Sequence, residues 1–207
     1  MPDELPFCTF DDYRKKVLDR EALFLEEGYD FALERARILD QVSPLPRRIL
    51  EAGTGKGHFT LALAERGLSF TTFDITAEDQ AVAKFHLRHH GLAAQVVFRI
   101  EHETRLSFPD ESFDILFCIN ALHHLTQPRA TLAEWLRILA PQGRMVLSDF
   151  SAEGFAIVER IHALEGRAHP REEFTIPLAM HFLQEKGLKV ARTGSRLQET
   201  LIAEKPL

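Results

Sequence analysis

The spacing of apolar positions divides the chain of 207 residues into two parts. Residues 1–45 place apolar side chains at helical spacing, and Asp30 precedes the second of two expected helices as a capping residue. The stretch SPLPRR at 43–48 carries two prolines, which interrupt a helix. We therefore predict a helical N-terminal extension over 1–45 and a separate domain over 46–207.

Beyond this boundary, short and continuous apolar runs alternate with amphipathic stretches. We expect strands at 47–53, 69–75, 95–101, 113–122 and 143–150, and helices at 58–67, 77–91 and 127–140. Strands of this kind that alternate with helices are typical of a mostly parallel sheet covered on both faces. After a further helix at 176–187, two apolar runs follow each other with only a short turn between them. This arrangement predicts an antiparallel hairpin at one edge of the sheet.

Composition and charge narrow the class of protein. Hydrophobic residues make up 45% and charged residues 27% of the chain, as in ordinary globular proteins. No stretch approaches the ~20 apolar residues of a membrane span, and the acidic first residues do not resemble a signal peptide. The net charge of −6 disfavours a broad phosphate-binding surface, so we expect no nucleic-acid partner. Cys8 and Cys118 are far apart, which favours a reduced, cytoplasmic location. The oligomeric state stays open between monomer and homodimer.

A glycine-rich loop follows the first expected strand of the domain. The stretch ILEAGTGKGHF at 49–59 has glycine at three alternate positions, Gly53, Gly55 and Gly57. The dinucleotide fingerprint G-x-G-x-x-G fails because His58 occupies its third glycine position. The phosphate-binding P-loop fails because Lys56 is followed by glycine instead of serine or threonine. Glu51, at the end of the strand, would repel a pyrophosphate but suits a cationic ligand. A nicotinamide-dependent oxidoreductase is therefore disfavoured.

Several segments together resemble a known family. LEAGTGKG (50–57), FDI (73–75) and the segments 106–125 and 136–150 are similar to the successive motifs of class I S-adenosylmethionine-dependent methyltransferases. The resemblance covers about residues 45–205. It implies an α/β fold with a doubly wound, mostly parallel seven-stranded sheet of strand order 3-2-1-4-5-7-6. The seventh strand is antiparallel and helices cover both faces.

The same resemblance implies a cofactor and its binding residues. S-adenosyl-L-methionine would donate the methyl group to a small-molecule acceptor and leave as S-adenosyl-L-homocysteine. Glu51 would bind the methionine ammonium, Asp74 the two ribose hydroxyls, and Ile75 the adenine ring. The backbone of the glycine loop would approach the methionine and ribose, and Asn120 would offer carbonyl oxygens near the sulfonium. The full set is Glu51, Gly53, Thr54, Gly55, Gly57, Asp74, Ile75, His102, Glu103 and Asn120.

One segment departs from the family pattern. The family often has Gly-Asp-Ala after the third strand, and its Asp accepts a hydrogen bond from the adenine amino group. Residues 101–103 are Glu-His-Glu in this chain. A neutral His102 imidazole or a neighbouring backbone group can accept in its place.

Four histidines are candidate catalytic residues. His123 and His124 follow the fourth strand of the domain, on a loop that faces the ligand crevice in such sheets. One of them could act as a general base, or the pair could order the loop. His162 and His169 share the spacing of one helix face with Glu165, if the helix extends that far. That face could form a polar substrate pocket, a two-His-one-carboxylate metal site, or a solvated surface. We assign no metal ligand.

The leading hypothesis is a small-molecule methyltransferase whose extension closes over the site as a lid and excludes water. The aromatic residues available to that lid are Phe7, Phe10, Tyr13, Phe24 and Tyr29. Two alternatives stay open. One is a non-catalytic S-adenosylmethionine-binding or scaffold protein, and the other is a partner-dependent methyltransferase of protein or RNA.

Overall fold

The computed structural model describes residues 4–5, 8–168 and 173–207. The N-terminal extension consists of a short hairpin followed by two helices, α1 (Phe10–Glu26) and α2 (Phe31–Gln41). The hairpin, β1 (Glu4–Leu5) with β2 (Cys8–Thr9), was not predicted. The expected cap of α2 is confirmed, because the Leu33 amide donates to Asp30 Oδ1 at 2.9 Å.

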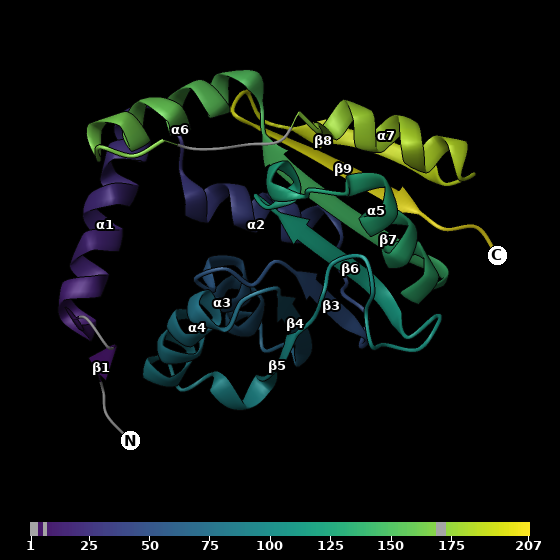
Figure 1. Ribbon diagram of the computed structural model, residues 1–207, viewed down its shortest axis with the longest axis horizontal. Coiled ribbons are helices and arrows are strands. Elements are labelled where there is room, and N and C mark those ends of the chain that lie inside the picture. The colour runs from purple at the N-terminus through teal and green to yellow at the C-terminus, as the bar shows by residue number, and fades with distance from the viewer. Residues whose placement is uncertain (1–3, 6–7, 169–172) are drawn as a thin grey trace.

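Seven strands of the described chain form one sheet, in the order β5-β4-β3-β6-β7-β9-β8 (Figure 1). β9 runs antiparallel to both neighbours, whereas the pairs among the first five strands are parallel. Numbered from β3, this order is 3-2-1-4-5-7-6, which confirms the expected doubly wound α/β fold. The strands are β3 (Ile49–Ala52), β4 (Phe70–Asp74), β5 (Val96–Ile100), β6 (Phe113–Ile119), β7 (Leu139–Phe150), β8 (Lys189–Gly194) and β9 (Gln198–Glu204).

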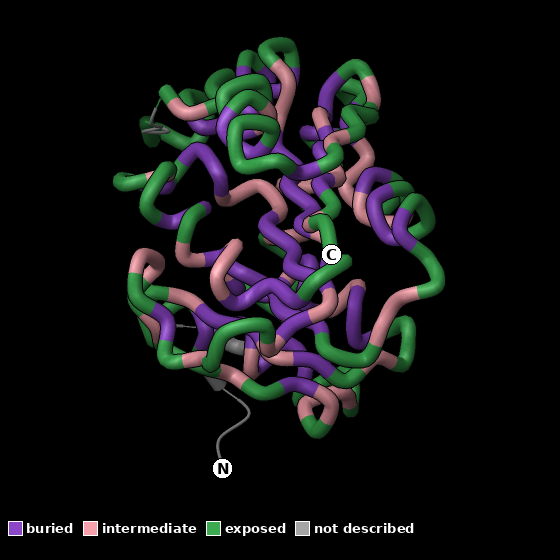
Figure 2. Tube along the Cα trace, turned by 90° about the vertical axis from the view of Figure 1, so that its right-hand side faces the viewer, coloured by how far each residue is buried: buried purple, intermediate pink, exposed green. Residues whose placement is uncertain are grey.

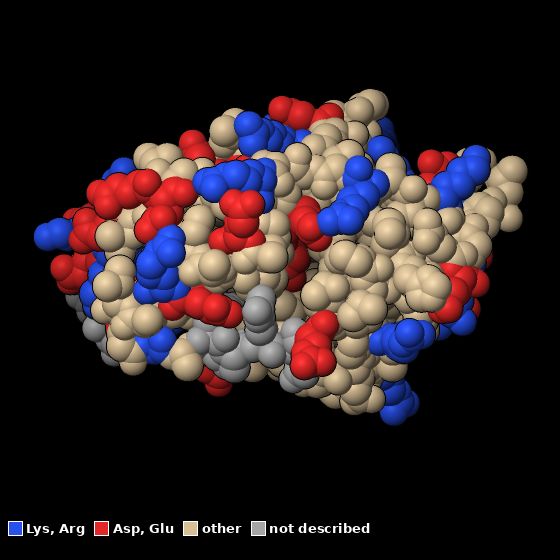
Figure 3. All heavy atoms as spheres, turned by 90° about the horizontal axis from the view of Figure 1, so that it is seen from above, with Lys and Arg blue, Asp and Glu red and all other residues tan. Residues whose placement is uncertain are grey.

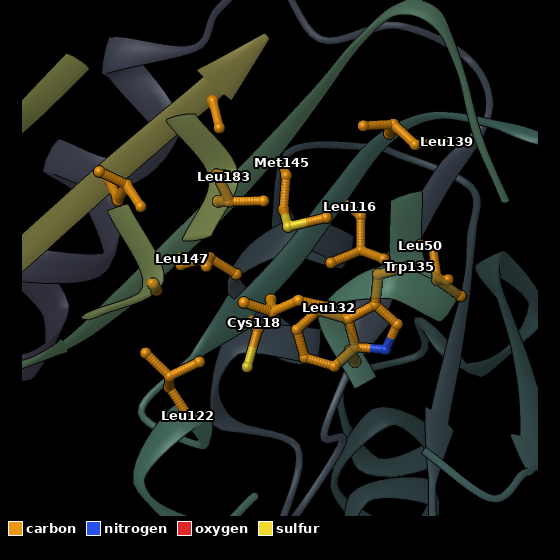
Figure 4. Close-up of a cluster of buried hydrophobic side chains, with 14 of the residues drawn as sticks. Leu50, Leu116, Cys118, Leu122, Leu132, Trp135, Leu139, Met145, Leu147 and Leu183 are labelled. Carbon is orange, nitrogen blue, oxygen red and sulfur yellow. The ribbon is translucent and has the colours of Figure 1, made fainter. Parts of the chain in front are cut away.

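Helices cover both faces of the sheet. They are α3 (His58–Glu65), α4 (Ala77–His89), α5 (Pro128–Ile138), α6 (Ala152–Leu164) and α7 (Ile176–Glu185), with short 3₁₀ turns η1 (Ala93–Gln95) and η2 (Leu122–His124). Along β6, Leu116 and Cys118 join a cluster with α5 and α7 (Figure 4), while Ile115 and Phe117 face α2, α3 and α4. The sheet is therefore the buried centre of the molecule (Figure 2).

Several expected boundaries differ from the structure; β6, for example, ends at Ile119 instead of residue 122. β7 begins at Leu139 instead of residue 143, because the β6–β7 register shifts and the strand continues through a bulge that the sequence indicates as a turn. α6 ends at Leu164, so Glu165 lies beyond the helix. The cause is Gly166, whose φ of +70° suits a helix terminus that most residues avoid.

The N-terminal extension packs against α6. Phe24 and Tyr29 are buried with Ile157, Val158 and Ile161, which lie on α6. Ion pairs reinforce the contact at the surface, such as the one of 2.6 Å between Glu27 and Arg160 on α6. Charges of both signs are intermixed over this part of the molecule, toward the left in Figure 3. No helix in the described part of the chain is long and apolar enough to span a membrane.

Candidate functional site

The expected site residues come together at one edge of the sheet. The parallel strands β3, β4, β6 and β7 all end there, and β9 begins there because it runs in the opposite direction. The edge therefore carries the glycine loop after β3, Asp74 at the end of β4, and Asn120 just beyond β6. In doubly wound sheets this is the edge where ligands bind.

The three glycines of the loop serve different purposes. A Cβ on Gly57 would lie 2.7 Å from Ala83 Cβ, so this glycine lets α4 pack against the start of α3. A Cβ on Gly53 would lie 2.9 Å from Ala121 Cβ, in the loop after β6. A Cβ on Gly55 would meet nothing within 4 Å. Gly55 thus borders open space, whereas Gly53 and Gly57 hold the loop against its neighbours.

Main-chain bonds fix the glycine loop to β4. The amides of Gly53 and Thr54 donate to Phe73 O at 2.9 and 3.0 Å. The Thr54 side chain is buried and lies 2.7 Å from the Thr72 hydroxyl. The Thr54 carbonyl in turn accepts from the Gly57 amide at 2.9 Å, so Thr54 holds the loop in place through its main chain and its hydroxyl.

Asp74 is oriented by the backbone around it. Its carboxylate accepts from the Gly55 amide at 2.7 Å and from the Ile75 amide at 2.8 Å. The next side chain, Ile75, is 61% exposed, which is unusual for a large apolar residue at the end of a buried strand. An oriented carboxylate beside an exposed apolar surface suits a ligand with vicinal hydroxyls and a flat ring.

Glu51 is a buried carboxyl group at the same edge. It is 2% exposed, and Oε2 accepts from the Thr60 hydroxyl of α3 at 2.7 Å. Burial raises the pKa of Glu51 to about 8, with a smaller contribution from the negative charge of Asp74. The free protein therefore holds this group mostly protonated at neutral pH, and a nearby cation would favour its ionised form.

A buried polar network joins the extension to the loop after β6. The Tyr29 hydroxyl donates to Gln198 Oε1 at 2.6 Å, and Gln198 Nε2 donates to Asn120 Oδ1 at 2.7 Å. Burial also raises the pKa of Tyr29. Because the Asn120 side-chain oxygen is engaged, its main-chain carbonyl is the better candidate for the sulfonium. Sequence reasoning missed this network, because Gln198 begins β9 among polar neighbours and Tyr29 was assigned only to the lid.

His123 and Asp149 form a buried pair where β6 and β7 end. His123 Nδ1 lies 2.8 and 2.9 Å from the two Asp149 carboxylate oxygens. The main-chain amide of His123 also donates to Asp149 Oδ2 at 3.0 Å. His124 follows on the same turn with an exposed side chain, and the two imidazole centroids are 4.0 Å apart.

The predicted helix face of His162, Glu165 and His169 was wrong, because α6 ends at Leu164. His169 lies outside the described residues. His162 Nε2 instead lies 2.5 Å from Arg20 Nη2, and Arg20 Nε donates to Glu165 at 2.9 Å. Burial lowers the pKa of His162, and the nearby arginines lower it further. This cluster joins α1 to the end of α6.

The segment after β5 is a tight turn. The Glu101 amide donates to Asp74 O at 3.0 Å, which fixes the turn beside the end of β4. His102 is exposed, and its Nδ1 lies 3.0 Å from the Thr104 hydroxyl. Glu103 accepts from the Thr126 hydroxyl at 3.2 Å. His102 therefore follows a residue that is hydrogen-bonded to Asp74. Its Nδ1 faces Thr104, which leaves Nε2 as the ring nitrogen that does not contact Thr104.

A cavity lies between α2 and α3, near the start of the helix that follows the glycine loop. Its volume is about 220 Å³, and Arg35 and His58 line it. The Arg35 guanidinium is 3.6 Å from the Glu21 carboxylate. Burial lowers the pKa of Arg35. Burial and the Arg35 charge lower the pKa of His58 to about 3, so this imidazole is neutral. Sequence reasoning did not select Arg35.

Comparisons with known proteins bear on the family and the fold. Residues 50–147 match the family model described as a methyltransferase domain. The chain is 30% identical over 176 residues to the uncharacterized methyltransferase YcgJ of Bacillus subtilis, covering 83% of this chain and 66% of that protein. It is 32% identical over 149 residues to a ubiquinone biosynthesis O-methyltransferase of Xylella fastidiosa, covering 66% of this chain and 60% of that protein. The chain thus spans about two thirds or less of these relatives' length.

A solved structure gives the same fold. The SAM-dependent methyltransferase of Aquifex aeolicus superposes with a TM-score of 0.66 at 21% identity, covering 83% of this chain and 89% of that one. The fold and the site define a Rossmann-like methyltransferase domain. The chain belongs to the class I S-adenosylmethionine-dependent methyltransferase family.

Proposed function

We propose that this chain transfers a methyl group from S-adenosylmethionine to a small-molecule acceptor. The observation that carries the proposal is the pair of carboxyl groups that flank the glycine loop. Glu51 is buried at one end, and Asp74 is oriented by two amides at the other. Between them the backbone at Gly55 borders open space. A zwitterionic sulfonium joined to a ribose presents an ammonium and two hydroxyls to such a site.

The assignment of cofactor residues follows from their positions. Glu51 takes the methionine ammonium, and Asp74 takes the ribose hydroxyls. Ile75 packs against the adenine, because an exposed apolar side chain gains from covering a flat ring. His102 and Glu103 border the adenine from the turn after β5. The main chain of Asn120 faces the sulfonium, and the glycine loop approaches the methionine.

The acceptor lies on the other side of the sulfonium, where the extension meets β7. Residues 1–45 act as the lid, a role supported by the burial of Phe24 and Tyr29 against α6. Tyr13 contributes by packing on Val82 and Phe85 of α4, whereas Phe7 lies outside the described residues. A relative named for ubiquinone biosynthesis supports a small acceptor.

For methyl transfer itself, the protein mainly has to align the accepting atom with the methyl carbon. The sulfonium already activates the methyl carbon, so the protein must hold the accepting atom in line and exclude water. Positioning of this kind can supply about 7–11 kcal/mol of the barrier. Of the predicted catalytic histidines, His123 and His124 lie three and four residues after Asn120, in η2. His162 sits where the lid meets α6, and His169 stays a prediction.

Calorimetric titration with S-adenosylmethionine and S-adenosylhomocysteine tests the cofactor assignment. We expect micromolar binding of both ligands, weakened at least tenfold by Asp74→Asn, since two charge-assisted hydrogen bonds are lost. Asp19→Asn is the matched control, because Asp19 is exposed on α1. Radiolabelled methyl transfer to a small-molecule panel then tests activity. Binding without transfer to any compound would favour the scaffold alternative, and no binding would refute the proposal.

A further inference from the structure

A buried carboxylate and imidazole face each other at the ends of β7 and β6. The exposed fractions of His123 and Asp149 are 2% and 3%. Besides the imidazole, Asp149 accepts main-chain hydrogen bonds from His123 at 3.0 Å and from Phe150 at 2.9 Å. Two backbone amides therefore fix the carboxylate before the imidazole contributes, and His123 Nδ1 is its remaining partner.

This arrangement sets the tautomer of the imidazole. A carboxylate that faces Nδ1 holds the proton on that nitrogen, which makes Nε2 the basic atom of the neutral ring. When Nε2 takes up a proton, the resulting imidazolium keeps its Nδ1 hydrogen bond to the carboxylate. The pair therefore has the geometry of a base and the group that orients it.

His123 and Asp149 lie near the residues that we assign to the sulfonium end of the cofactor. His123 belongs to η2, three residues after Asn120. The loop between them packs against the glycine loop, because a Cβ on Gly53 would lie only 2.9 Å from Ala121 Cβ. The base is thus carried by a segment in contact with the cofactor loop.

Aromatic side chains surround the imidazole. Phe155 of α6 meets His123 edge to face with a centroid distance of 5.1 Å, and Phe150 lies at 6.1 Å. Tyr29 of the lid packs on Phe150 at 5.5 Å. These neighbours exclude water and favour an apolar, planar acceptor over a charged one. A role confined to ordering the loop would need only the main-chain bond between His123 and Asp149.

We propose that His123 is the general base of this methyltransferase, that Asp149 is its positioning residue, and that the acceptor is an un-ionised hydroxyl on an aromatic molecule. This inference rests on the proposed function. The hydroxyl oxygen attacks the methyl carbon and forms the new C–O bond while its proton passes to His123 Nε2. The C–S bond breaks, and its electron pair stays on sulfur, which becomes the neutral thioether of S-adenosylhomocysteine. Asp149 remains ionised throughout.

The test compares acceptors that need a base with acceptors that do not. Phenol and catechol keep their protons near neutral pH, whereas 4-nitrophenol and 4-nitrocatechol ionise more readily. The variant His123→Asn keeps an amide donor for Asp149 but has no basic nitrogen. We expect it to lose about 100-fold or more in turnover of phenol and catechol, but about tenfold or less with the nitro compounds. Its affinity for S-adenosylmethionine should equal that of the unchanged protein.

Two further variants complete the design. His181→Asn is the matched control, because His181 also faces a carboxylate, Glu185 at 3.1 Å, but is exposed on α7; it should change neither rate. Asp149→Asn should lose up to about 10⁴-fold with un-ionised acceptors, the loss seen when an orienting carboxylate fails to hold its histidine. If this variant does not fold, His123→Asn carries the test.

Nitrogen NMR of the imidazole gives a readout that needs no acceptor. The titratable groups in contact with His123 in the described chain are Asp149, 2.8 Å from Nδ1, and His124, whose ring centroid lies 4.0 Å away. His162 acts electrostatically on His124. We expect neutral His123 to carry its proton on Nδ1, and Asp149→Asn to relax this preference. A proton fixed on Nε2, or an imidazolium that persists to about pH 9, would overturn the proposal.

The outcomes separate the inference from the proposed function. Cofactor binding with methyl transfer only to amines or thiols would refute the assignment of a hydroxyl acceptor. If His123→Asn lost the same factor in turnover with both classes of phenol, the assignment of His123 as the base would be refuted. If the cofactor binds and no compound is methylated, the tautomer of His123 tests the inference. A proton fixed on Nε2 then overturns it. Absence of cofactor binding would refute the proposed function itself.

Discussion

The proposed contact between Glu51 and the ammonium of the cofactor links cofactor binding to pH in a way that can be calculated. With a pKa of about 8, the carboxyl group is roughly ten parts protonated to one part ionised at pH 7. The proposed ammonium contact requires the ionised form, so we expect binding to release close to one proton at pH 7. Below pH 8 the affinity should then fall about tenfold for each pH unit, or about 1.4 kcal/mol.

The variant Glu51→Gln isolates this effect, because an amide of the same shape does not titrate in this range. Its affinity should be independent of pH. At pH 7.5 we expect it to bind S-adenosylmethionine more weakly than the unchanged protein. Near pH 6 the two affinities should converge, since Glu51 itself is then protonated.

The same raised pKa predicts an opposite effect on stability. The folded pKa of about 8 exceeds the ordinary value of 4.5, so the folded state retains a proton that the unfolded state has lost. Stability attributable to this group is therefore highest below pH 4.5 and falls as the pH rises from there to 8. At pH 7 the cost is at most about 3 kcal/mol. Glu51→Gln should accordingly raise the unfolding temperature of the free protein by several degrees at neutral pH.

Calorimetry in two buffers of different ionisation enthalpy counts the protons released, and thermal unfolding at pH 5 and pH 7.5 measures the stability effect. An affinity that stays flat between pH 6 and 7.5, or a Glu51→Gln variant that unfolds at a lower temperature than the unchanged protein, would refute the reasoning.

Other substitutions separate packing from ligand binding. Gly57→Ala should destabilise the protein by more than about 2 kcal/mol, because its Cβ would overlap α4 at a positive φ. Gly55→Ala should cost only about 1–2 kcal/mol for its positive φ but weaken cofactor binding strongly, as titration would reveal. Ile75→Ser should change the free energy of unfolding by less than about 0.5 kcal/mol. It should weaken cofactor binding by about 1 kcal/mol or more. Tyr29→Phe should cost about 1–2 kcal/mol in urea unfolding, because buried Gln198 loses its donor.

The alternation of strands and helices could be predicted from the sequence because buried parallel strands are continuous apolar runs. Ile115 to Cys118 illustrate this, since their side chains face helices on alternate sides and all four are buried. The order of the strands came from the family resemblance, as periodicity does not determine which strands are neighbours. The hairpin of two-residue strands before α1 is too short to leave a pattern.

The positions of site residues were predictable, but their partners were not. The family resemblance located Asp74 and Asn120, which it places near the ends of the second and fourth strands of the domain. The contacts that define their roles join distant segments, such as His123 with Asp149 or Tyr29 with Gln198. One error was avoidable, because Gly166 is a common helix terminator and predicts that α6 ends before residue 169.

The glycine motif is recognisable because packing and ligand binding constrain it together. Gly53 and Gly57 are needed by the fold, since a side chain at either would collide with a neighbouring segment. Their packing, with the bonds from this loop to β4, sets the loop in place before a ligand arrives. Asp74 is likewise oriented by an amide of the loop. A site built this way loses little conformational entropy on binding. If Glu51 binds the ammonium as we propose, the largest cost of cofactor recognition is the ionisation of Glu51 rather than a rearrangement of the backbone.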